Sequence, residues 1–222
     1  MIFVFLGPPG AGKGTQARLL LQDFSNMVQL STGDMLREAV ASGSRIGEEV
    51  ATLIQSGQLV PDHVVVDLIR QNLENLESGV DVILDGFPRN VAQAKSLDVI
   101  LSCLHRPLTA AISLEVDDAI LVERVAGRFT CVKCGEGYHD HYKIPSREGI
   151  CDQCGGKEFL RRQDDTALAV KTRLDSYHEQ TKPLLDFYNS RALLHEVYGL
   201  AEIQSVFSEI KSIINSMQRL TS

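Results

Sequence analysis

The sequence predicts an α/β fold: a five-stranded parallel sheet covered by helices on both faces and interrupted by two insertions. Three observations lead to this expectation. Short apolar runs alternate with segments of helical periodicity, as in parallel sheets buried on both faces. A glycine-rich loop joins the first run to the first helical segment, and a window rich in cysteine later breaks the pattern. The 222 residues, 44% of them hydrophobic, suffice for one core with appendages.

Each element follows from apolar periodicity and from the residues that bound it. Buried strands are expected at the short apolar runs 2–6, 27–30, 80–84, 110–114 and 194–198. Helices are expected at 16–24, 35–41, 46–56, 64–76, 90–104, 118–127, 166–188 (with a bend at Pro183) and 203–217. Segments 31–60 and 128–164 add no strand to the sheet, so they are expected to be insertions in a core made of 1–30, 61–127 and 165–222.

The loop after the first strand has the composition of a phosphate-binding site. It reads GPPGAGKGT from Gly7 to Thr15. Glycines allow positive φ and bring backbone N–H groups close to an anion, while the helix N-terminus and Lys13 add positive charge. The spacing GxxxxGK between a strand and a helix is a specific signal for polyphosphate binding. Because Gly14 follows the lysine, the hydroxyl arrives one place later than in the usual pattern, at Thr15.

A second polar segment, DGFPR at 85–89, follows the expected strand at 80–84. It therefore lies at the carboxyl end of a parallel strand, the edge at which open α/β sheets bind ligands. Asp85 has the character of a carboxylate that holds the hydration shell of Mg²⁺ beside phosphates. The sequence thus places a magnesium contact next to the phosphate loop.

Four of the five cysteines form two CxxC pairs with sixteen residues between them. The members of these pairs are Cys131, Cys134, Cys151 and Cys154. This spacing is typical of a tetrahedral Cys₄ zinc site that is structural, because four thiolates leave no open position. Zinc ribbons of this pattern also occur in nucleic-acid binders. Cys103 lies in an apolar helical segment and is expected in the core, whereas His139 and His141 are expected on the surface of the insertion.

The charge balance argues against two classes of partner. A net charge of −7 does not favour a surface for nucleic acid or anionic membranes. No segment approaches the roughly 18 consecutive apolar residues of a membrane span, and the first apolar run is too short for a signal peptide. We therefore expect a soluble, cytoplasmic protein, and the absence of an obvious apolar stripe favours a monomer.

Several motifs together resemble those of the adenylate kinases, over essentially the entire chain. They are GxPGxGKGT at 7–15, STGDMLR at 31–37, LVPD at 59–62, DGFPR at 85–89 and the cysteine pairs, which match the zinc-bearing lid of many bacterial members. The resemblance implies a three-layer P-loop NTPase fold with an AMP-binding insertion and a lid. It also implies Mg²⁺-dependent conversion of ATP and AMP to two ADP, with zinc as a structural ion.

The resemblance implies a donor site around the phosphate loop and the lid. The residues implied to bind ATP are Gly10, Ala11, Gly12, Lys13, Gly14, Thr15, Arg124, Arg128, Gly137, Tyr138 and Ala201. Family members carry a Thr-Tyr or Ser-Tyr pair where this chain has Gly137-Tyr138, so one side-chain hydroxyl is lost here.

The acceptor site is implied between the first insertion and the core. The residues implied to bind AMP are Thr32, Arg37, Gln58, Leu59, Val60, Gly86, Phe87, Pro88, Arg89, Gln93, Arg162 and Arg173. Backbone groups of 58–60 would border the purine, and the amide of Gln93 would match the N1 and N6 edge of adenine. Arg89 would pair bidentately with the phosphate. Considered singly, Thr32 could be an ordinary helix cap and Arg37 a solvated surface charge.

Phosphoryl transfer needs charge neutralisation and in-line positioning more than an acid or a base. The resemblance accordingly implies that the catalytic groups are Lys13, Arg89, Arg124, Arg128, Arg162 and Arg173. Arg162 is preferred to Arg161 because Arg-x-Asp-Asp is the family spacing. Two alternatives stay open: a kinase for UMP and CMP, whose members usually carry Ala and Asn in place of Thr32 and Gln93, and a zinc-ribbon nucleic-acid-binding ATPase.

Overall fold

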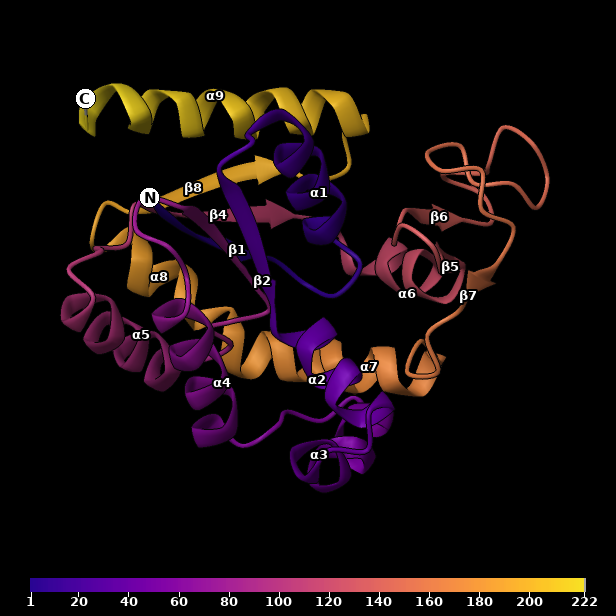
Figure 1. Ribbon diagram of the computed structural model, residues 1–222, viewed down its shortest axis with the longest axis horizontal. Helices are drawn as coiled ribbons and strands as arrows, with labels where there is room; N and C mark the ends of the chain where they lie inside the picture. The colour runs from indigo at the N-terminus through magenta and orange to yellow at the C-terminus, as the bar shows by residue number, and fades with distance from the viewer. Residues whose placement is uncertain (222) are drawn as a thin grey trace.

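The computed structural model describes residues 1–221, and its core is a five-stranded parallel sheet (Figure 1). Its strand order is β2-β3-β1-β4-β8. The strands are β1 (Ile2–Leu6), β2 (Met27–Ser31), β3 (Asp81–Asp85), β4 (Ala110–Glu115) and β8 (Leu194–Tyr198). All four neighbouring pairs are parallel, with Phe3 opposite Ile83 on one side and Ala110 on the other. The predicted five-stranded parallel sheet is confirmed.

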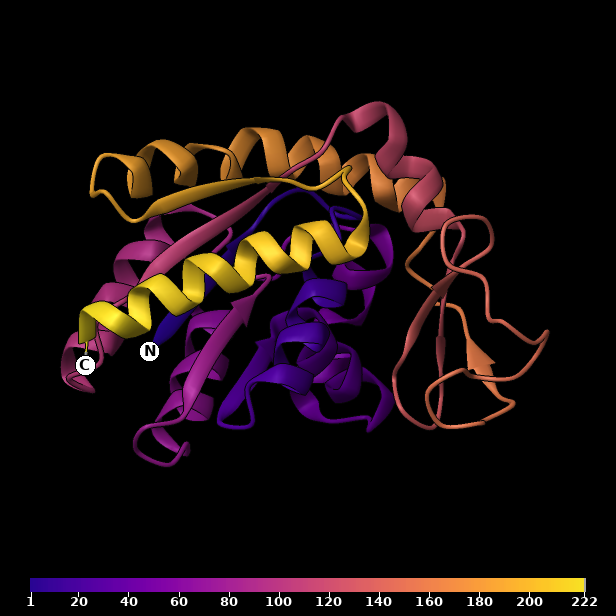
Figure 2. The same cartoon turned by 90° about the horizontal axis from the view of Figure 1, so that it is seen from above.

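Helices cover both faces of the sheet because the strands alternate their buried side chains between the two faces. Phe3 and Phe5 of β1 pack on the side of α1 (Lys13–Asp23) and α9 (Ile203–Thr221). Ile2 and Val4 instead belong to the larger cluster on the opposite face. The helices that contribute to that cluster are α2 (Thr32–Ala41), α3 (Arg45–Ser56), α4 (Asp62–Glu74), α5 (Val91–Cys103) and α8 (Pro183–Asn189). Figures 1 and 2 show α1 and α9 together on one face and α4, α5 and α8 on the other.

The first insertion is a pair of helices, α2 and α3, that share the core of the sheet. Ser31 caps α2, since its Oγ accepts a hydrogen bond from the Asp34 backbone N–H at 3.3 Å. Thr32 is therefore the first residue of the helix, and its hydroxyl donates to the Gly86 carbonyl at 2.9 Å. The helix begins three residues earlier than the sequence pattern indicated, because the cap lies before the first apolar residue of the pattern.

The second insertion follows α6 (Asp118–Ala126) and forms a small antiparallel sheet of its own. Its strands are β5 (Arg128–Cys131), β6 (Gly137–His139) and β7 (Phe159–Leu160), in the order β6-β5-β7. In both views this segment projects from the core beside the helical insertion (Figures 1 and 2). These strands are separate from the five-stranded sheet, in agreement with the expectation that 128–164 adds no strand to it.

The expected helix at 166–188 is interrupted earlier than Pro183. It consists of α7 (Ala167–Ser176), a π-helical turn η1 (Tyr177–Thr181) and α8. Pro183 occupies the first turn of α8, where its missing N–H is tolerated. None of the helices described combines the length and hydropathy that a segment crossing a bilayer needs.

Two side-chain placements differ from the sequence-based expectations. Cys103 is exposed, because α5 turns Leu97, Ile100 and Leu101 toward the core and its last residue falls on another face. His139 is buried rather than on the surface. Its Nε2 lies 3.1 Å from the Glu123 carbonyl of α6, so it joins the second insertion to the core.

Candidate active site

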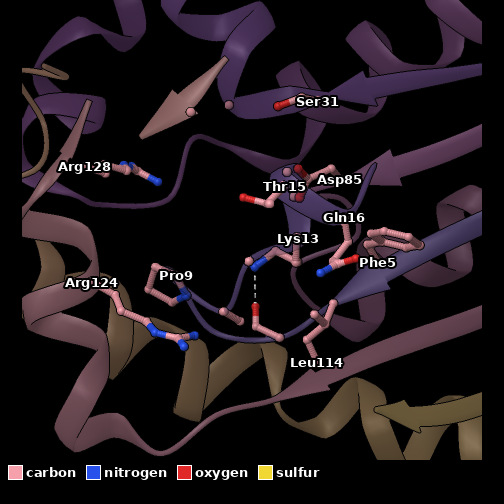
Figure 3. A pocket seen from close by; sticks show the side chains of 18 of the residues that line it. Phe5, Pro9, Lys13, Thr15, Gln16, Ser31, Asp85, Leu114, Arg124 and Arg128 are labelled. Carbon is pink, nitrogen blue, oxygen red and sulfur yellow. Dashed lines mark hydrogen bonds between the residues drawn. The ribbon is translucent and has the colours of Figure 1, made fainter. Parts of the chain in front are cut away.

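A cleft of about 730 Å³ lies between the core and the two insertions, beyond the carboxyl ends of the strands. The phosphate loop forms its floor, and residues of both insertions form its walls. Figure 3 shows Lys13, Thr15 and Asp85 at the floor, with Arg124 and Arg128 on the side of the second insertion. The cleft therefore brings together residues that are more than a hundred positions apart in the chain.

The phosphate loop is held open by backbone conformations that favour glycine. Gly12 precedes α1 with φ of +100°. At Gly7, an added Cβ would lie 2.6 Å from the Leu114 carbonyl oxygen, so a larger residue would push the loop away from β4. The loop thus places backbone N–H groups at the N-terminus of α1, where the helix dipole favours an anion.

Lys13 extends across this loop and donates hydrogen bonds to the carbonyls of Gly7 at 2.6 Å and Pro8 at 2.9 Å. One of these bonds is drawn in Figure 3. Burial lowers the pKa of Lys13 to about 8; Asp85 opposes this shift, whereas Arg89 and Arg128 add to it. A polyphosphate in the cleft would supply the negative charge that favours the protonated lysine.

Asp85 ends β3 beside the phosphate loop. Its Oδ2 accepts a hydrogen bond from Gln29 Nε2 at 2.9 Å and lies 3.8 Å from the position that a Cβ would take at Gly14. A carboxylate this close to the N-terminus of α1 can hold the hydration shell of a cation bound to the phosphates. The sequence-predicted magnesium contact is therefore placed next to the predicted phosphate site.

The cleft concentrates positive charge. Seven arginines line it: Arg18, Arg37, Arg89, Arg124, Arg128, Arg162 and Arg173. Burial lowers the pKa of Arg89, and the neighbouring Arg173 lowers it further. Burial also lowers the pKa of Arg162 to about 10, with Arg128 and Arg37 adding to the effect. Each guanidinium disfavours the positive charge of its neighbours. An anionic ligand would offset this repulsion, so the cleft favours binding of an anion.

Three aspartates partly compensate this charge and connect the walls of the cleft. Asp34 of α2 accepts a hydrogen bond from Arg162 at 2.9 Å. Asp164 forms an ion pair with Arg173 and lies 3.5 Å from Arg37. Asp165 pairs with Arg128. Because Asp34–Arg162 and Arg37–Asp164 each join the two insertions, the segment after the lid strands is tied to the helical insertion.

The cleft collects most of the sequence-predicted binding residues. Besides the arginines, its lining includes Gly10, Ala11, Gly12, Lys13, Gly14, Thr15, Gln58, Leu59, Val60, Asp85, Gly86, Pro88, Gly137, Tyr138 and Ala201. Thr32, Phe87 and Gln93 are not among the described residues that line it. Each of the three is at most 1% exposed. The Thr32 hydroxyl donates to the Gly86 carbonyl and the Gln93 amide oxygen accepts from the Arg89 N–H, so these two side chains lie behind the lining residues Gly86 and Arg89. Arg161, adjacent to Arg162, instead pairs with Asp140 on the surface of the lid.

The four predicted metal ligands lie together in the second insertion, with their sulfur atoms all within 4.8 Å of one another. Cys131 and Cys154 have sulfurs 3.6 Å apart, and Cys134 and Cys151 have sulfurs 3.5 Å apart. A tetrahedral shell with Zn–S bonds near 2.3 Å requires about 3.8 Å between sulfurs, so the cluster fits such an ion.

Sequence reasoning missed several residues around the site. Tyr142 lines the cleft and faces Arg124, whose Cζ lies 5.6 Å from the ring centroid. Arg18 of α1 pairs with Glu136 of the lid at 3.5 Å. Asp62 accepts a hydrogen bond from Gln93. In each case the partner is distant in sequence or follows no recognisable spacing, so no local signal could reveal the contact.

Comparison with known proteins agrees with the geometry. The sequence profile described as "Adenylate kinase" matches residues 5–193. The chain belongs to the adenylate kinase family. It is 48% identical over 216 residues to the adenylate kinase of Paramagnetospirillum magneticum, covering 97% of this chain and 99% of that protein. It is also 49% identical over 213 residues to that of Sphingopyxis alaskensis, covering 96% and 97% respectively.

Membership of the family establishes the reaction. An adenylate kinase is a phosphotransferase that moves the terminal phosphoryl group of ATP to AMP and gives two ADP, reversibly and with Mg²⁺ accompanying ATP. The chain therefore has a nucleotide-binding kinase activity. A kinase for UMP and CMP and a nucleic-acid-binding ATPase are not favoured, since the relatives matched over nearly their full length are named adenylate kinase.

Proposed function

We propose that this adenylate kinase binds ATP between the phosphate loop and the lid at 128–164, and AMP between the core and the helical insertion at 31–60. The observation that carries this assignment is the ring of seven arginines around one cleft, with Lys13 and the loop amides at its floor. Such a ring provides the charge neutralisation that phosphoryl transfer requires. The remaining segments, 1–30, 61–127 and 165–222, form the core that holds both nucleotides.

In the proposed reaction, a phosphate oxygen of AMP attacks the γ-phosphorus of ATP, and the bond from that phosphorus to the β-γ bridging oxygen breaks. Lys13 and the amides of 10–15 hold the donor phosphates. Arg89 holds the phosphate of AMP, and Arg124, Arg128, Arg162 and Arg173 stabilise the negative charge as it moves to the departing ADP. Magnesium held through water by Asp85 would neutralise donor charge when bound. Closure of both insertions excludes the water that would otherwise hydrolyse ATP.

For the bases, we propose that the backbone of 58–60 with Gly86, Phe87 and Pro88 borders the AMP purine. Thr32, Arg37 and Gln93 complete that site. Arg124, Ala201 and the Gly137-Tyr138 pair contact ATP. Support comes from the lining of the cleft, which includes most of these positions. Thr32 and Gln93 lie directly behind its wall, and the Gln93 Oε1 accepts a hydrogen bond from the Arg89 backbone at 2.7 Å.

We further propose that the cysteine cluster holds one structural zinc ion. Four thiolates complete a tetrahedral shell and leave no position for a water or a phosphate. The protein is proposed to act as a cytoplasmic monomer that binds neither nucleic acid nor membranes. Its net charge of −7 supports the absence of nucleic-acid and anionic-membrane binding. A titration with single-stranded RNA at increasing salt checks this point, since a nucleic-acid binder would show salt-sensitive affinity.

A coupled ADP-production assay with ATP as donor and AMP, UMP, CMP or GMP as acceptor tests the assignment of the acceptor site. AMP is expected to be the preferred acceptor. Gln93→Leu removes the matched polar contact to the base and should raise KM for AMP by about 5- to 150-fold, with KM for ATP nearly unchanged. Equal use of CMP and AMP by the wild type would overturn the base assignment.

A further inference from the structure

The side-chain amide of Gln93 is held by two partners of fixed polarity. Its Oε1 accepts a hydrogen bond from the Arg89 backbone N–H at 2.7 Å, and its Nε2 donates to Asp62 Oδ1 at 2.7 Å. A backbone N–H can only donate, and an ionised carboxylate can only accept. One orientation of the amide satisfies both partners, and the flipped orientation satisfies neither.

Asp62 is itself fixed in place. Asn90 Nδ2 donates to both carboxylate oxygens, at 3.0 and 3.1 Å, and Asn90 Oδ1 caps α5 by accepting from the Gln93 backbone N–H at 2.8 Å. Asp62 is also the first residue of α4, immediately after the segment at 58–61 that leads out of the helical insertion. The three polar side chains therefore form one network that joins α4 to α5 behind the cleft wall.

We propose that Asp62 is a positioning residue that fixes the orientation of the Gln93 amide and thereby selects a 6-aminopurine over a 6-oxopurine in the acceptor site. The inference rests on the proposed contact between Gln93 and the base of AMP. Each amide atom keeps unused capacity, since the oxygen has a second lone pair and the nitrogen a second hydrogen.

The two classes of purine present opposite patterns to this amide. Adenine has an N6 amino group that donates and an N1 that accepts, so it needs the amide oxygen at N6 and the amide nitrogen at N1. Hypoxanthine has an O6 that accepts and an N1–H that donates, so it needs the amide flipped. In the wild type, the flip would set the Gln93 oxygen against a carboxylate and its NH₂ group against the Arg89 N–H. Inosine monophosphate is therefore disfavoured for two reasons. Its O6 and N1–H do not match the amide in the orientation found, and the hydrogen bonds of the protein oppose the flip that would match them.

The decisive experiment compares AMP with inosine monophosphate as acceptors in Asp62→Asn. An asparagine can turn either its oxygen or its NH₂ group toward Gln93, so the penalty for flipping is removed at that end. The ratio of kcat/KM for AMP to that for inosine monophosphate should fall about tenfold or more, with KM for ATP unchanged. Asn90→Ser keeps a helix cap but removes both bonds to Asp62, and it should shift the ratio in the same direction by less.

Asp67→Asn is the matched control, because Asp67 lies on the same helix and pairs at the surface with Arg70. It should leave the ratio unchanged. An unchanged ratio in a folded Asp62→Asn variant, beside a raised KM for AMP in Gln93→Leu, would overturn the role of Asp62 and leave the base contact standing. An unchanged KM for AMP in Gln93→Leu would overturn the base contact itself, and the inference with it.

Discussion

The two insertions that enclose the cleft are stabilised in different ways. The helical insertion contributes Leu36, Val50 and Val60 to the same apolar cluster as the strands of the sheet. The lid has a separate small cluster, in which the buried thiols of Cys131 and Cys151 pack with aromatic rings. The helical insertion therefore shares the apolar core of the sheet, whereas the lid depends on a separate small core.

The contrast shows what a short segment needs when it projects from the core. The lid exposes large apolar side chains such as Val132, Ile144 and Leu160, so it buries too little surface to order its loops by apolar packing alone. The four clustered sulfurs would supply the missing cross-links on holding a metal ion, as proposed above. The helical insertion has no need of such a device, because its buried side chains already belong to the apolar cluster of the sheet.

The largest expected effect concerns the core residues that hold the phosphates between the two insertions. Lys13→Met or Arg89→Ala should lower kcat by about 10³- to 10⁵-fold, because each removes a charge that stabilises the transferring phosphoryl group. Both variants should fold, which circular dichroism checks, and steady-state kinetics measures the loss. Turnover near the wild-type value in either variant would mean that the site is placed wrongly.

The second prediction tests the lid. Purified protein should contain about one zinc ion per chain, and Cys131→Ser or chelation should unfold the lid at a lower temperature than the core, because metal binding and local folding are coupled. Hydrogen exchange should then show lost protection in β5 to β7 and unchanged protection in α2 and α3. Turnover should persist at low temperature.

Cys103→Ser provides the matched control, since this cysteine is exposed on α5 and lies outside the cluster. It should change neither the zinc content nor the melting profile. If zinc removal left the melting profile unchanged and yet stopped phosphoryl transfer outright, the metal would not be structural.

The sequence predicted most of the core because its signals are local. The apolar runs, the glycine spacing of 7–15 and the CxxC pairs each report on a few neighbouring residues, and the sheet, the phosphate loop and the cysteine cluster follow them. The placement of His139 depends instead on a contact with the Glu123 carbonyl of α6, sixteen positions away, and no local pattern predicted the π-helical turn η1.

The same limit applies to the site. The positions of Thr32 and Gln93 behind the cleft wall depend on partners far along the chain, namely Gly86 for Thr32 and Asp62 for Gln93. Sequence spacing predicts which residue types lie near the site. The long-range hydrogen bonds determine which of their polar atoms already have a partner within the protein. The role proposed for Asp62 therefore follows from the structure and could not be predicted from the sequence.

The third prediction tests the shared core of the helical insertion. Val50 is 2% exposed and belongs to the main cluster, so Val50→Ala should lower the free energy of unfolding by about 2 kcal/mol. Because the cluster includes side chains of the sheet, the whole core should unfold in one transition, at a lower denaturant concentration than in the wild type. Val99→Ala, at a position 63% exposed on α5, is the control and should cost less than about 0.5 kcal/mol. A local transition confined to α2 and α3 would contradict the sharing of one core.

The smallest expected effect concerns the contact between the lid and α1. Glu136 of the lid is buried and pairs with Lys143 within the lid and with Arg18 of α1 at 3.5 Å. Because the Arg18 side chain is one-third exposed, its pair with Glu136 should contribute at most about 1 kcal/mol to lid closure. Arg18→Gln should therefore raise KM for ATP by less than about fivefold, leave KM for AMP unchanged and make KM for ATP less sensitive to salt.

Arg45→Gln is the matched control, because Arg45 pairs with Glu49 on the exposed side of α3, and both side chains are mostly exposed. The double variant Arg18→Gln/Glu136→Gln separates the two contacts of the carboxylate. If the core-to-lid pair acts in closure, Arg18→Gln should have no further effect on KM for ATP once Glu136 is replaced. Additive effects would show instead that Arg18 acts on ATP directly. The lid would then be positioned by the contact of His139 with α6, by the ion pairs Arg128–Asp165 and Asp164–Arg173 at its base, and by the nucleotide.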